Sequence, residues 1–415
     1  MLDIAYIRQN AEEVRRACKN KQIDSTVVDQ LLELDEARRT MQQKVDDLRR
    51  DSNEHARKLK QNVANGSLPS DADKELGKEF KNKLKELEPQ LKEIEDSYQT
   101  LMYQIPNVPA NDVPVGPDES GNQMIRQVGK PKTYDFEVKS HEEIMTQLGW
   151  LDIDRAVKIG GFRSYFLKGD GLRLEQALLR VALDRLVAAG FEPMSVPVLV
   201  NEDAMWGTGY FPWGQEDHYK TQDNQFLTGT AEVALTAYRQ GETLTEKELP
   251  FQICGISPCF RREVGSYGKD TSGVIRVHQF NKVEQVVYTV ADEVITREWH
   301  EKMVGLAEQL LQDLELPYQV LLMCTGDMGA GQRKKYDIET WFPDQQKYRE
   351  THSASYFNDF QARRLNIKYQ AKDGSTKFVY TLNNTMAASP RLLAAIIENY
   401  QQPDGSVAIP KLLTF

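Results

Sequence analysis

The 415-residue sequence lacks the features that direct a protein to a membrane or out of the cell. It contains no run of 18 apolar residues, so no membrane-spanning helix is predicted. Its first ten residues, MLDIAYIRQN, have neither the basic start nor the long apolar core of a signal peptide. Its four cysteines (Cys18, Cys254, Cys259 and Cys324) form no C-x-x-C pair, which argues against a disulfide framework and predicts that no zinc is bound. The expectation is a cytoplasmic protein with reduced thiols and no membrane partner.

The common nucleotide-binding and nucleophile signatures are also missing. The sequence has no G-x-x-x-x-G-K-[ST] loop, no G-x-G-x-x-G fingerprint and no recognisable nucleophile triad. The formal net charge is −10, yet an acidic total does not exclude a nucleic-acid partner, because local basic patches decide that. With 27% charged and 40% hydrophobic residues, the composition is that of a globular protein long enough for two or three domains.

Two apolar stripes follow a short helical lead-in, with the three- and four-residue spacing of a coiled-coil seam. The first contains Leu31, Leu34, Met41, Val45, Leu48 and Leu59, and the second contains Phe80, Leu84, Leu87, Leu91, Ile94, Tyr98, Leu101 and Ile105. The stretch NVANGSLPSD at 62–71 separates them, which predicts an antiparallel helical hairpin, each helix about 50 Å long, that projects as an arm. Pro89 lies within the second stripe and predicts a kink or a local break there.

The first helix of this hairpin is basic. Between positions 38 and 60 it carries eight basic residues against four acidic ones. The basic residues are Arg38, Arg39, Lys44, Arg49, Arg50, Arg57, Lys58 and Lys60. Heptads of this kind most often form a dimerisation coiled coil, whereas a basic face on an exposed helix also suits a phosphate backbone. The residues alone leave both interpretations open.

Proline and glycine mark a boundary after the helical region. Residues 105–122 read IPNVPANDVPVGPDESGN, a composition typical of a linker. We therefore expect a helical domain at 1–104 with its arm at about 27–104, a linker at 105–128 and a second domain at 129–415. In the second domain, 161–171 predicts a hairpin, and the residues after it predict a helix ending at Gly190. The stretch 194–200 predicts a strand whose Pro197 must lie at a sheet edge or a subunit boundary.

The segment from Cys254 to Glu284 concentrates charged groups between two strand-like patterns. It contains Arg261, Arg262 and Glu263, then the loop GSYGKDTSG, then an alternation of apolar and polar residues. This pattern predicts an antiparallel hairpin. Its arginines could pair bidentately with phosphate or carboxylate oxygens, and the alternative is a solvated edge with incidental ion pairs.

The same segment resembles motif 2 of the seryl-tRNA synthetases, which are class II aminoacyl-tRNA synthetases, through FRRE, GSYGKDTSG and IRVHQFNKVE. Residues 173–200 resemble motif 1, and TLNNTMAASPRLLAAIIENY at 381–400 is similar to motif 3. The stretches FLTGTAEVAL at 226–235 and YRETHSASYFNDFQARR at 348–364 also match the family. This resemblance spans nearly the whole chain. It implies an α+β fold, an antiparallel-sheet class II catalytic domain with an N-terminal antiparallel two-helix coiled-coil arm.

The resemblance also implies an activity. The family activates L-serine with ATP to seryl-adenylate and transfers the seryl group to the 3′ end of tRNA(Ser), and the sequence leaves open whether tRNA(Sec) is charged as well. Mg²⁺ would accompany the ATP. The arm would grip the long variable arm of the tRNA, and motif 1 would form a homodimer. Class I synthetase chemistry is disfavoured because its nucleotide-binding motifs are absent.

Functional residues carry over by position in the matching motifs. Arg261, Arg391 and Glu350 are the expected catalytic groups, with Arg261 on the α-phosphate and Arg391 on the γ-phosphate of ATP. The ATP site would include Arg261, Arg262, Glu263, Val277, Glu350, Thr351, His352, Ser353 and Arg391, and within it Glu350 and Ser353 would hold Mg²⁺. The serine site would comprise Thr230, Ala231, Glu232, Arg261, Glu284 and Thr385.

Some positions depart from the family pattern. ETHSAS stands where the family usually has EISSCS, and NNTM and PR replace the NGSG and GR of motif 3. Two other functions therefore stay open at this point. The first is a non-catalytic paralogue that acts as an interaction scaffold, which the intact Arg261, Glu263, Glu350 and Arg391 disfavour. The second is a ligase that charges a carrier protein, which the arm disfavours.

Overall fold

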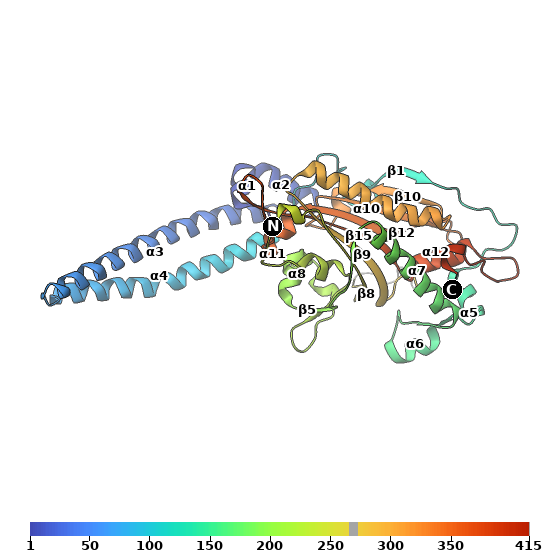
Figure 1. Ribbon diagram of the computed structural model, residues 1–415, viewed down its shortest axis with the longest axis horizontal. Helices are drawn as coiled ribbons and strands as arrows, with labels where there is room; N and C mark the ends of the chain where they lie inside the picture. The colour runs from blue at the N-terminus through green and yellow to red at the C-terminus, as the bar shows by residue number, and fades with distance from the viewer. Residues whose placement is uncertain (265–272, 415) are drawn as a thin grey trace. The chain divides into compact units, whose positions relative to one another are not determined.

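The computed structural model describes residues 1–264 and 273–414, and the chain divides into two compact units (Figure 1). One unit contains Leu2–Lys19 and Ile23–Pro106. The other contains Met1, Asn20–Gln22 and the chain from Asn107 onward. Across the described ranges, no helix combines the length and the apolar character needed to cross a lipid bilayer.

The N-terminal unit is entirely helical. Two short helices, α1 (Ile4–Gln9) and α2 (Ala11–Asn20), precede two long ones, α3 (Thr26–Ala64) and α4 (Asp71–Gln104). The long helices lie side by side and run in opposite directions (Figure 1). A capping box starts α4, because Ser70 Oγ accepts from the Asp73 amide while the Asp73 carboxylate accepts from the Ser70 amide. The predicted helical hairpin is confirmed.

The two apolar stripes form the seam between α3 and α4. Leu31, Val45 and Leu91 are buried, and the other stripe residues within the helices are half-buried, as expected where only two helices cover each other. The helix α4 continues through Pro89, so the predicted local break is wrong. Pro89 and Lys85 are both exposed, and water can therefore satisfy the Lys85 carbonyl that loses its helical partner.

The C-terminal unit is built on an eight-stranded sheet in the order β1-β10-β11-β12-β15-β9-β8-β4. The strands in that order are β1 (Gln123–Val128), β10 (Tyr318–Leu322), β11 (Lys334–Phe342), β12 (Lys347–Asn358), β15 (Tyr380–Ala388), β9 (Gln279–Thr289), β8 (Phe251–Phe260) and β4 (Glu192–Ser195). All neighbouring pairs are antiparallel except β4 and β8. The predicted α+β fold is confirmed, and so is the hairpin of β8 and β9.

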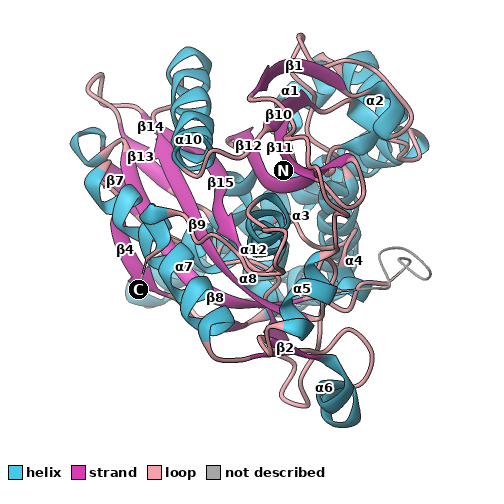
Figure 2. Ribbon diagram, turned by 90° about the vertical axis from the view of Figure 1, so that its right-hand side faces the viewer, coloured by secondary structure: helices cyan, strands magenta, loops and turns pink. Residues whose placement is uncertain are grey.

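Helices cover both faces of this sheet (Figure 2). On one face α7 (Asp170–Ala188), α10 (Glu293–Asp313) and α12 (Arg391–Asn399) pack against the strands and form the larger hydrophobic core. On the other face lie three short helices, α8 (Glu202–Thr208), α9 (Glu232–Ala237) and α11 (Phe360–Leu365). Strand β9 shows the division, because Val287 belongs to the larger core and its neighbour Val286 to a second core cluster.

Two local predictions in this unit are wrong, and a third, the strand at 194–200, is only partly right. The predicted linker at 105–128 extends too far, since 123–128 form β1 of the sheet. The predicted hairpin at 161–171 does not form, because β3 (Phe166–Leu167) pairs instead with β2 (Leu151–Asp152), and α6 (Ile153–Gly160) lies between them. Composition identifies a turn-rich stretch but not the strand it pairs with.

The predicted strand at 194–200 is divided in two. Strand β4 ends at Ser195, and β5 (Leu199–Val200) pairs with β6 (Phe226–Leu227) instead of joining the large sheet. Pro197 lies in the gap, where its missing N–H interrupts no ladder. Within the described sheet β4 is an edge strand, in agreement with the expectation that this proline lies at an edge.

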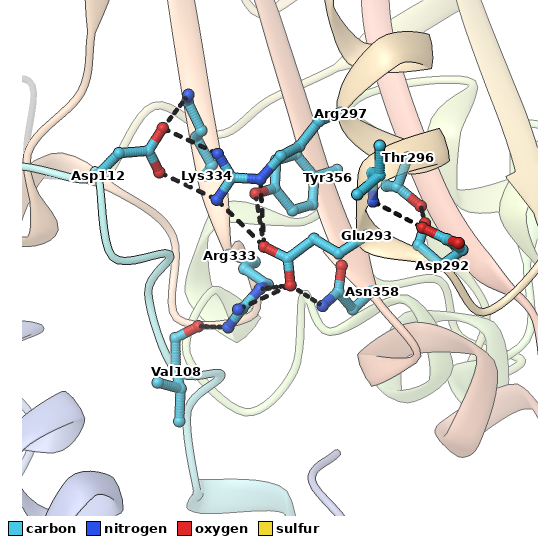
Figure 3. Close-up of polar contacts among 11 residues, drawn as sticks. Val108, Asp112, Asp292, Glu293, Thr296, Arg297, Arg333, Lys334, Tyr356 and Asn358 are labelled. Carbon is cyan, nitrogen blue, oxygen red and sulfur yellow. Dashed lines mark hydrogen bonds and ion pairs between the residues drawn. The ribbon is translucent and has the colours of Figure 1, made fainter.

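The segment after Asn107 is fastened to the sheet by ion pairs (Figure 3). Asp112 accepts from Lys334 Nζ at 2.7 Å and from Arg297 at 3.0 and 3.1 Å. Glu293 at the start of α10 in turn binds Arg297 and Arg333, and Arg333 also donates to the carbonyl of Val108. The network joins this segment to α10 and to the first residues of β11.

Replacement of Asp112 by asparagine should destabilise the fold at neutral pH and do so less in acid. Partial burial alone would raise the pKa of Asp112, but Lys334 and Arg297 outweigh it and lower the pKa to about 2. A carboxyl whose pKa is depressed in the folded state stabilises above its unfolded pKa of about 4, and the effect disappears as pH falls toward 2. Because Asp112 is partly solvated, we expect Asp112→Asn to lower the free energy of unfolding by about 1 kcal/mol at pH 7.

Urea unfolding at pH 7 and at pH 3 measures this effect. The stability difference between the wild type and Asp112→Asn should narrow at the lower pH. Asp223→Asn is the control, since Asp223 is exposed and has no ion pair in the described parts of the chain. An Asp112→Asn difference that stays constant between the two pH values would contradict the assigned role of the ion pairs.

Candidate active site

A cavity of about 270 Å³ opens on the sheet face opposite α7 and α10. The ends of β8 and β9, the strands β11, β12 and β15, and the start of α12 contribute its walls. Eleven residues that the sequence predicts for the site line it: Glu232, Arg261, Glu263, Val277, Glu284, Glu350, Thr351, His352, Ser353, Thr385 and Arg391. The four separate segments that carry these residues therefore meet at one place.

Two β-bulges set the orientation of the lining residues. In the ladder of β11 and β12, Glu339 pairs with Glu350 and Ile338 with His352, so Thr351 is an extra residue. Residues three apart in a regular strand point to opposite faces, but the bulge brings Glu350 and Ser353 to the same side. A second bulge in β15, between Thr385 and Ala387, does the same for Thr385 and Ala388, which both line the cavity.

One end of the cavity is rich in positive charge. Arg391 is the first residue of α12, and its Nη1 donates to the Glu350 carbonyl at 2.7 Å and lies 3.5 Å from the Glu350 carboxylate. Arg261 follows β8, where its Nε donates to the Gly229 carbonyl and its guanidinium lies 5.2 Å from the centre of the Phe280 ring. Both arginines therefore face the same cavity and have donors left for a ligand.

Glu350 lies among these cations. Desolvation by the surrounding protein would raise its pKa, but Lys335, Arg391 and Arg261 outweigh that effect and lower the pKa from its usual value. The Glu350 side chain is 46% exposed and faces the cavity, and the Ser353 hydroxyl lies on the same side of β12. Carboxylate and hydroxyl oxygens are ligands that suit Mg²⁺. Among the described residues no three His, Cys, Asp or Glu side chains could hold a metal ion, so such an ion would need further oxygens from a bound phosphate.

Lys335 and Asp337 extend this charged wall along β11. Lys335 Nζ lies 2.9 Å from Asp337 Oδ2, and Asp337 pairs directly with Ser353 across the ladder. Burial raises the pKa of Asp337 to about 7, and the nearby Glu350 carboxylate adds to the rise although Lys335 opposes it. This part of the structure therefore holds one lysine and two carboxyl groups close together.

The opposite end of the cavity contains buried carboxylates. Glu284 on β9 forms an ion pair with Lys282, and it accepts from the hydroxyls of Thr230 and Thr385 at 3.4 Å each. Thr385 stands directly opposite Glu284 in the ladder of β15 and β9, which places both side chains on the same face. All four side chains are buried.

Glu232 is the second carboxylate at this end and lies at the start of α9. Its oxygens accept from Tyr210 Oη at 2.8 Å and from Gln361 Nε2 at 3.0 Å. Burial is the main cause that raises the pKa of Glu232 to about 7, and the Glu284 charge adds to it. A buried carboxyl that titrates near neutral pH in a cavity is typical of a binding or catalytic group.

Glu263 occupies a third wall. Its backbone has a φ of 56°, a left-handed conformation that is uncommon for glutamate. Its carboxylate accepts from Arg276 at 2.7 Å and lies 3.8 Å from Arg163, which fixes its direction. Val277, next to Arg276 in the chain, also lines the cavity.

Three residues predicted for the site lie outside the cavity lining. Arg262 is exposed and donates to the Glu216 carbonyl at 2.9 Å. Ala231 packs in the second core cluster with Leu235 and Ile253. Thr230 is joined to the site by two hydrogen bonds, since its hydroxyl donates to Glu284 and accepts from the Glu232 amide. The predicted loop at 265–272 lies outside the described residues.

Sequence reasoning missed several residues that build the site. Lys282, Lys335 and Asn383 line the cavity, and Tyr210 and Gln361 hold Glu232. The period-two spacing of Lys282 and Glu284, and of Lys335 and Asp337, could have indicated a shared strand face. Tyr210 lies in an irregular segment and carries no sequence signal that we can identify.

Comparison with known proteins agrees with this geometry. A family model described as the seryl-tRNA synthetase N-terminal domain matches residues 1–109. A second model, described as the class II tRNA synthetase core domain (G, H, P, S and T), matches residues 216–400. The two models therefore cover both units of the chain.

Individual relatives match over the full length. A serine–tRNA ligase of Deinococcus radiodurans is 44% identical over 100% of this chain and 96% of the relative. The crystal structure of the Pyrococcus horikoshii seryl-tRNA synthetase complexed with ATP superposes with a TM-score of 0.91, at 39% identity over 100% of this chain and 97% of that one. The cytoplasmic serine–tRNA ligase of Naegleria fowleri in complex with AMP gives 0.87, at 32% identity over 100% and 96%. On these matches and on its fold, the chain belongs to the seryl-tRNA synthetase family.

Proposed function

We propose that the protein activates L-serine with ATP to form seryl-adenylate and then transfers the seryl group to the 3′ end of tRNA(Ser). The observation that carries this proposal is a single cavity lined both by arginines, among them Arg261 and Arg391, and by two buried carboxylates, Glu232 and Glu284. Arg261 and Arg391 suit a polyphosphate, whereas Glu232 and Glu284 suit the ammonium and hydroxyl groups of serine. The crystallised relatives with ATP and AMP bound support the nucleotide half of the proposal.

Adenylate formation depends mainly on position and charge. A serine carboxylate oxygen attacks the α-phosphorus of ATP, a mixed anhydride forms, and the bond to the β-phosphate oxygen breaks to release pyrophosphate. Arg261 would contact the α-phosphate, where charge develops, and Arg391 the γ-phosphate, which holds the triphosphate bent. Glu263 would accept from the adenine amino group, and the backbone of Val277 would also contact adenine.

Glu350 and Ser353 would hold Mg²⁺ together with the phosphates, since both present oxygen atoms on the same side of β12. When bound, the ion would neutralise phosphate charge. The protein's own part is to keep the two oxygens at the phosphate end of the cavity, where the Arg391 bond to the Glu350 carbonyl fixes the strand. Thr351 is buried, bonded to Thr340 at 2.7 Å, and completes the bulge that orients its neighbours.

Selection of serine would follow from buried groups that need a hydroxyl partner. Glu284 pairs with Lys282 and accepts long bonds, at 3.4 Å, from Thr230 and Thr385, all at Oε2, so its Oε1 can accept a shorter bond from a ligand hydroxyl. Alanine would leave this carboxylate without that partner in a buried site. Sites built for a hydroxyl reject the analogue without it by about 10⁴-fold.

Serine binding should weaken as pH falls through about 7. In the free enzyme the pKa of Glu232 is about 7, mainly because of burial, so below that pH the carboxylate is protonated and loses its attraction for the serine ammonium. We expect kcat/KM for serine to fall about tenfold per pH unit below pH 7. Pyrophosphate exchange at subsaturating serine from pH 5.5 to 8.5 measures this, and Glu232→Gln should be slow but flat over the range. A wild-type profile that is flat at subsaturating serine, with saturating ATP, would remove the role of Glu232.

We infer that the tRNA contacts the arm through its phosphate backbone, and the ion pairs of the arm indicate which cations are available. Arg38 and Arg39 bind the buried carboxylate of Asp35 together with Arg8. Arg49, Arg50 and Lys58 also pair with acidic neighbours, Glu88, Asp47 and Glu54. Lys44, Arg57 and Lys60 have no ion pair within the described arm, so they are the best phosphate ligands among the eight.

Two features outside the site complete the proposal. A homodimer through motif 1 is supported by the edge position of β4 and by exposed apolar side chains at Leu172 and Leu199 within residues 170–200. A cytoplasmic location is supported by the four cysteines, which are all free and buried.

ATP–pyrophosphate exchange with each of the twenty amino acids tests the proposed function. Exchange should depend on serine, with alanine at least about 10³-fold less effective. Exchange at background level with every amino acid would favour the non-catalytic scaffold. Exchange with serine but no charging of tRNA(Ser) would favour the carrier-protein ligase.

A further inference from the structure

A buried histidine joins two parts of the proposed ATP site from outside the cavity. His141 is the first residue of α5 (His141–Gln147), and only 3% of it is exposed. Its Nδ1 lies 2.7 Å from Oε1 of Glu398, and its backbone N–H donates to the same oxygen at 3.2 Å. Glu398 is fully buried on α12, and its other oxygen accepts from the Asp344 amide. Both oxygens of the Glu398 carboxylate therefore accept hydrogen bonds.

The other ring nitrogen reaches the motif 2 hairpin. The backbone N–H of Val274 donates to His141 Nε2 at 3.2 Å. Since an N–H must meet a lone pair, Nε2 carries no proton, and Nδ1 carries the proton that is donated to Glu398. The approach also requires glycine at position 273, where a Cβ would lie 2.2 Å from Nε2. The histidine is therefore fixed in one tautomer by a bond on each side.

Both bonded elements carry residues of the cavity. Helix α12 begins with Arg391, and Ile275, Arg276 and Val277 follow Val274 directly and line the cavity. Arg391 Nε also donates to the Ile275 carbonyl at 3.4 Å. Helix α12 therefore holds this segment in two ways. Arg391, its first residue, binds Ile275 directly, and Glu398, near its last residue, binds Val274 through His141.

We propose that His141 is a positioning residue for ATP, which sets the segment 274–277 against α12 so that the adenine and γ-phosphate contacts lie at a fixed separation. The inference rests on the proposed ATP roles of Val277 and Arg391. His141 itself does not touch the ligand. Its effect is on ATP affinity, because displacement of one wall by about an ångström weakens both contacts.

The chain contains a matched control for a purely structural role. Gln401 lies just after α12 and ties the end of this helix to Lys139, just before α5, since its Oε1 accepts from the Lys139 amide at 2.9 Å and its Nε2 donates to the carbonyls of Lys139 and Glu398. Gln401 is buried like His141, but none of its described bonds reaches the hairpin. Gln401→Ala therefore loosens the joint between α5 and α12 and leaves Val274 untouched.

Two substitutions of His141 separate its two bonds. In His141→Asn the amide nitrogen takes the place of Nδ1, which keeps the bond to Glu398 and removes the one to Val274. In His141→Gln the amide oxygen takes the place of Nε2, which keeps the acceptor for Val274 and removes the side-chain bond to Glu398, while the backbone bond to Glu398 remains. Each variant is made in the full chain, and binding of a non-hydrolysable ATP analogue and the KM values for ATP and serine are measured.

We expect His141→Asn to weaken analogue binding and raise KM for ATP by about tenfold or more, while KM for serine changes by less than about twofold. In His141→Gln and Gln401→Ala, the analogue affinity and the KM for ATP should stay within about threefold of the wild-type values. Equal losses in all three variants, or a parallel rise of both KM values in His141→Asn, would overturn the proposal. If the Asn variant is too unstable to purify, analogue affinity of His141→Gln decides, since a tenfold loss there contradicts the assignment. Wild type that binds the analogue but exchanges no pyrophosphate would refute the proposed function and leave this test valid.

Discussion

Replacement of Arg261 by alanine should reduce serine-dependent pyrophosphate exchange by at least about 10³-fold. Its guanidinium and that of Arg391 are the two that line the cavity and are proposed to bind the triphosphate, and Arg261 is the one proposed for the α-phosphate, where charge develops. Removal of a single preorganised donor to a developing charge lowers kcat by about 10² to 10³-fold, and a charged fork contributes more than a neutral donor. Lysine should restore little, because a point charge cannot pair bidentately.

The same variant should keep its fold. The described bonds of the Arg261 side chain are limited to one contact with the Gly229 carbonyl and the stacking on Phe280. Thermal unfolding of Arg261→Ala should therefore stay within a few degrees of the wild type. Arg262→Ala is the matched control, since Arg262 is its neighbour in sequence and points to Glu216 outside the cavity. Undiminished exchange in Arg261→Ala, or equal losses in the two variants, would refute the role of Arg261.

Shortening of the arm should separate the two half-reactions. Removal of residues 46–90 with a short Gly-Ser turn keeps the buried Val45 and Leu91 and the cluster around Asp35. The ion pair between Arg49 and Glu88 shows that the two ends of the cut lie at the same level of the hairpin. We expect serine-dependent exchange to stay within about twofold, while KM for tRNA(Ser) rises by about 10²-fold as phosphate contacts are lost.

A charge variant refines this test without a deletion. The triple alanine variant of Lys44, Arg57 and Lys60 should raise KM for tRNA and flatten its dependence on salt by about one unit of slope per lost phosphate contact. The triple alanine variant of the ion-paired Arg49, Arg50 and Lys58 is the control, and it should change the KM for tRNA and its salt dependence less than the first variant does. Parallel loss of exchange and charging in the shortened arm would mean that the arm supports the fold instead.

Local patterns predicted the elements of the fold well. The heptad stripes gave the helical hairpin, and the alternation between Cys254 and Glu284 gave the pairing of β8 with β9. These features depend on residues close in sequence, which periodicity reports directly. The pairing of β2 with β3 and the separation of β5 from β4 depend on partners far along the chain, so composition could not reveal them.

The site was predictable only where a motif marked it. Eleven of the predicted residues line the cavity, but Tyr210, which binds Glu232, comes from an irregular segment where neither spacing nor charge indicates a role. Charge counting also overestimated the available cations on the arm. Arg38 and Arg39 are engaged by Asp35, and a count of like charges does not consider such partners.

The bulge at Thr351 links the spacing of residues in β12 to the direction of the proposed Mg²⁺ ligands. Glu350 and Ser353 are three residues apart, and they point into the same cavity because β12 contains one residue more than β11 at this place. A regular ladder with the same residues would keep every functional group and still turn one of the two oxygens toward the helices. The three-residue spacing of Glu350 and Ser353 and the bulge at Thr351 therefore depend on each other.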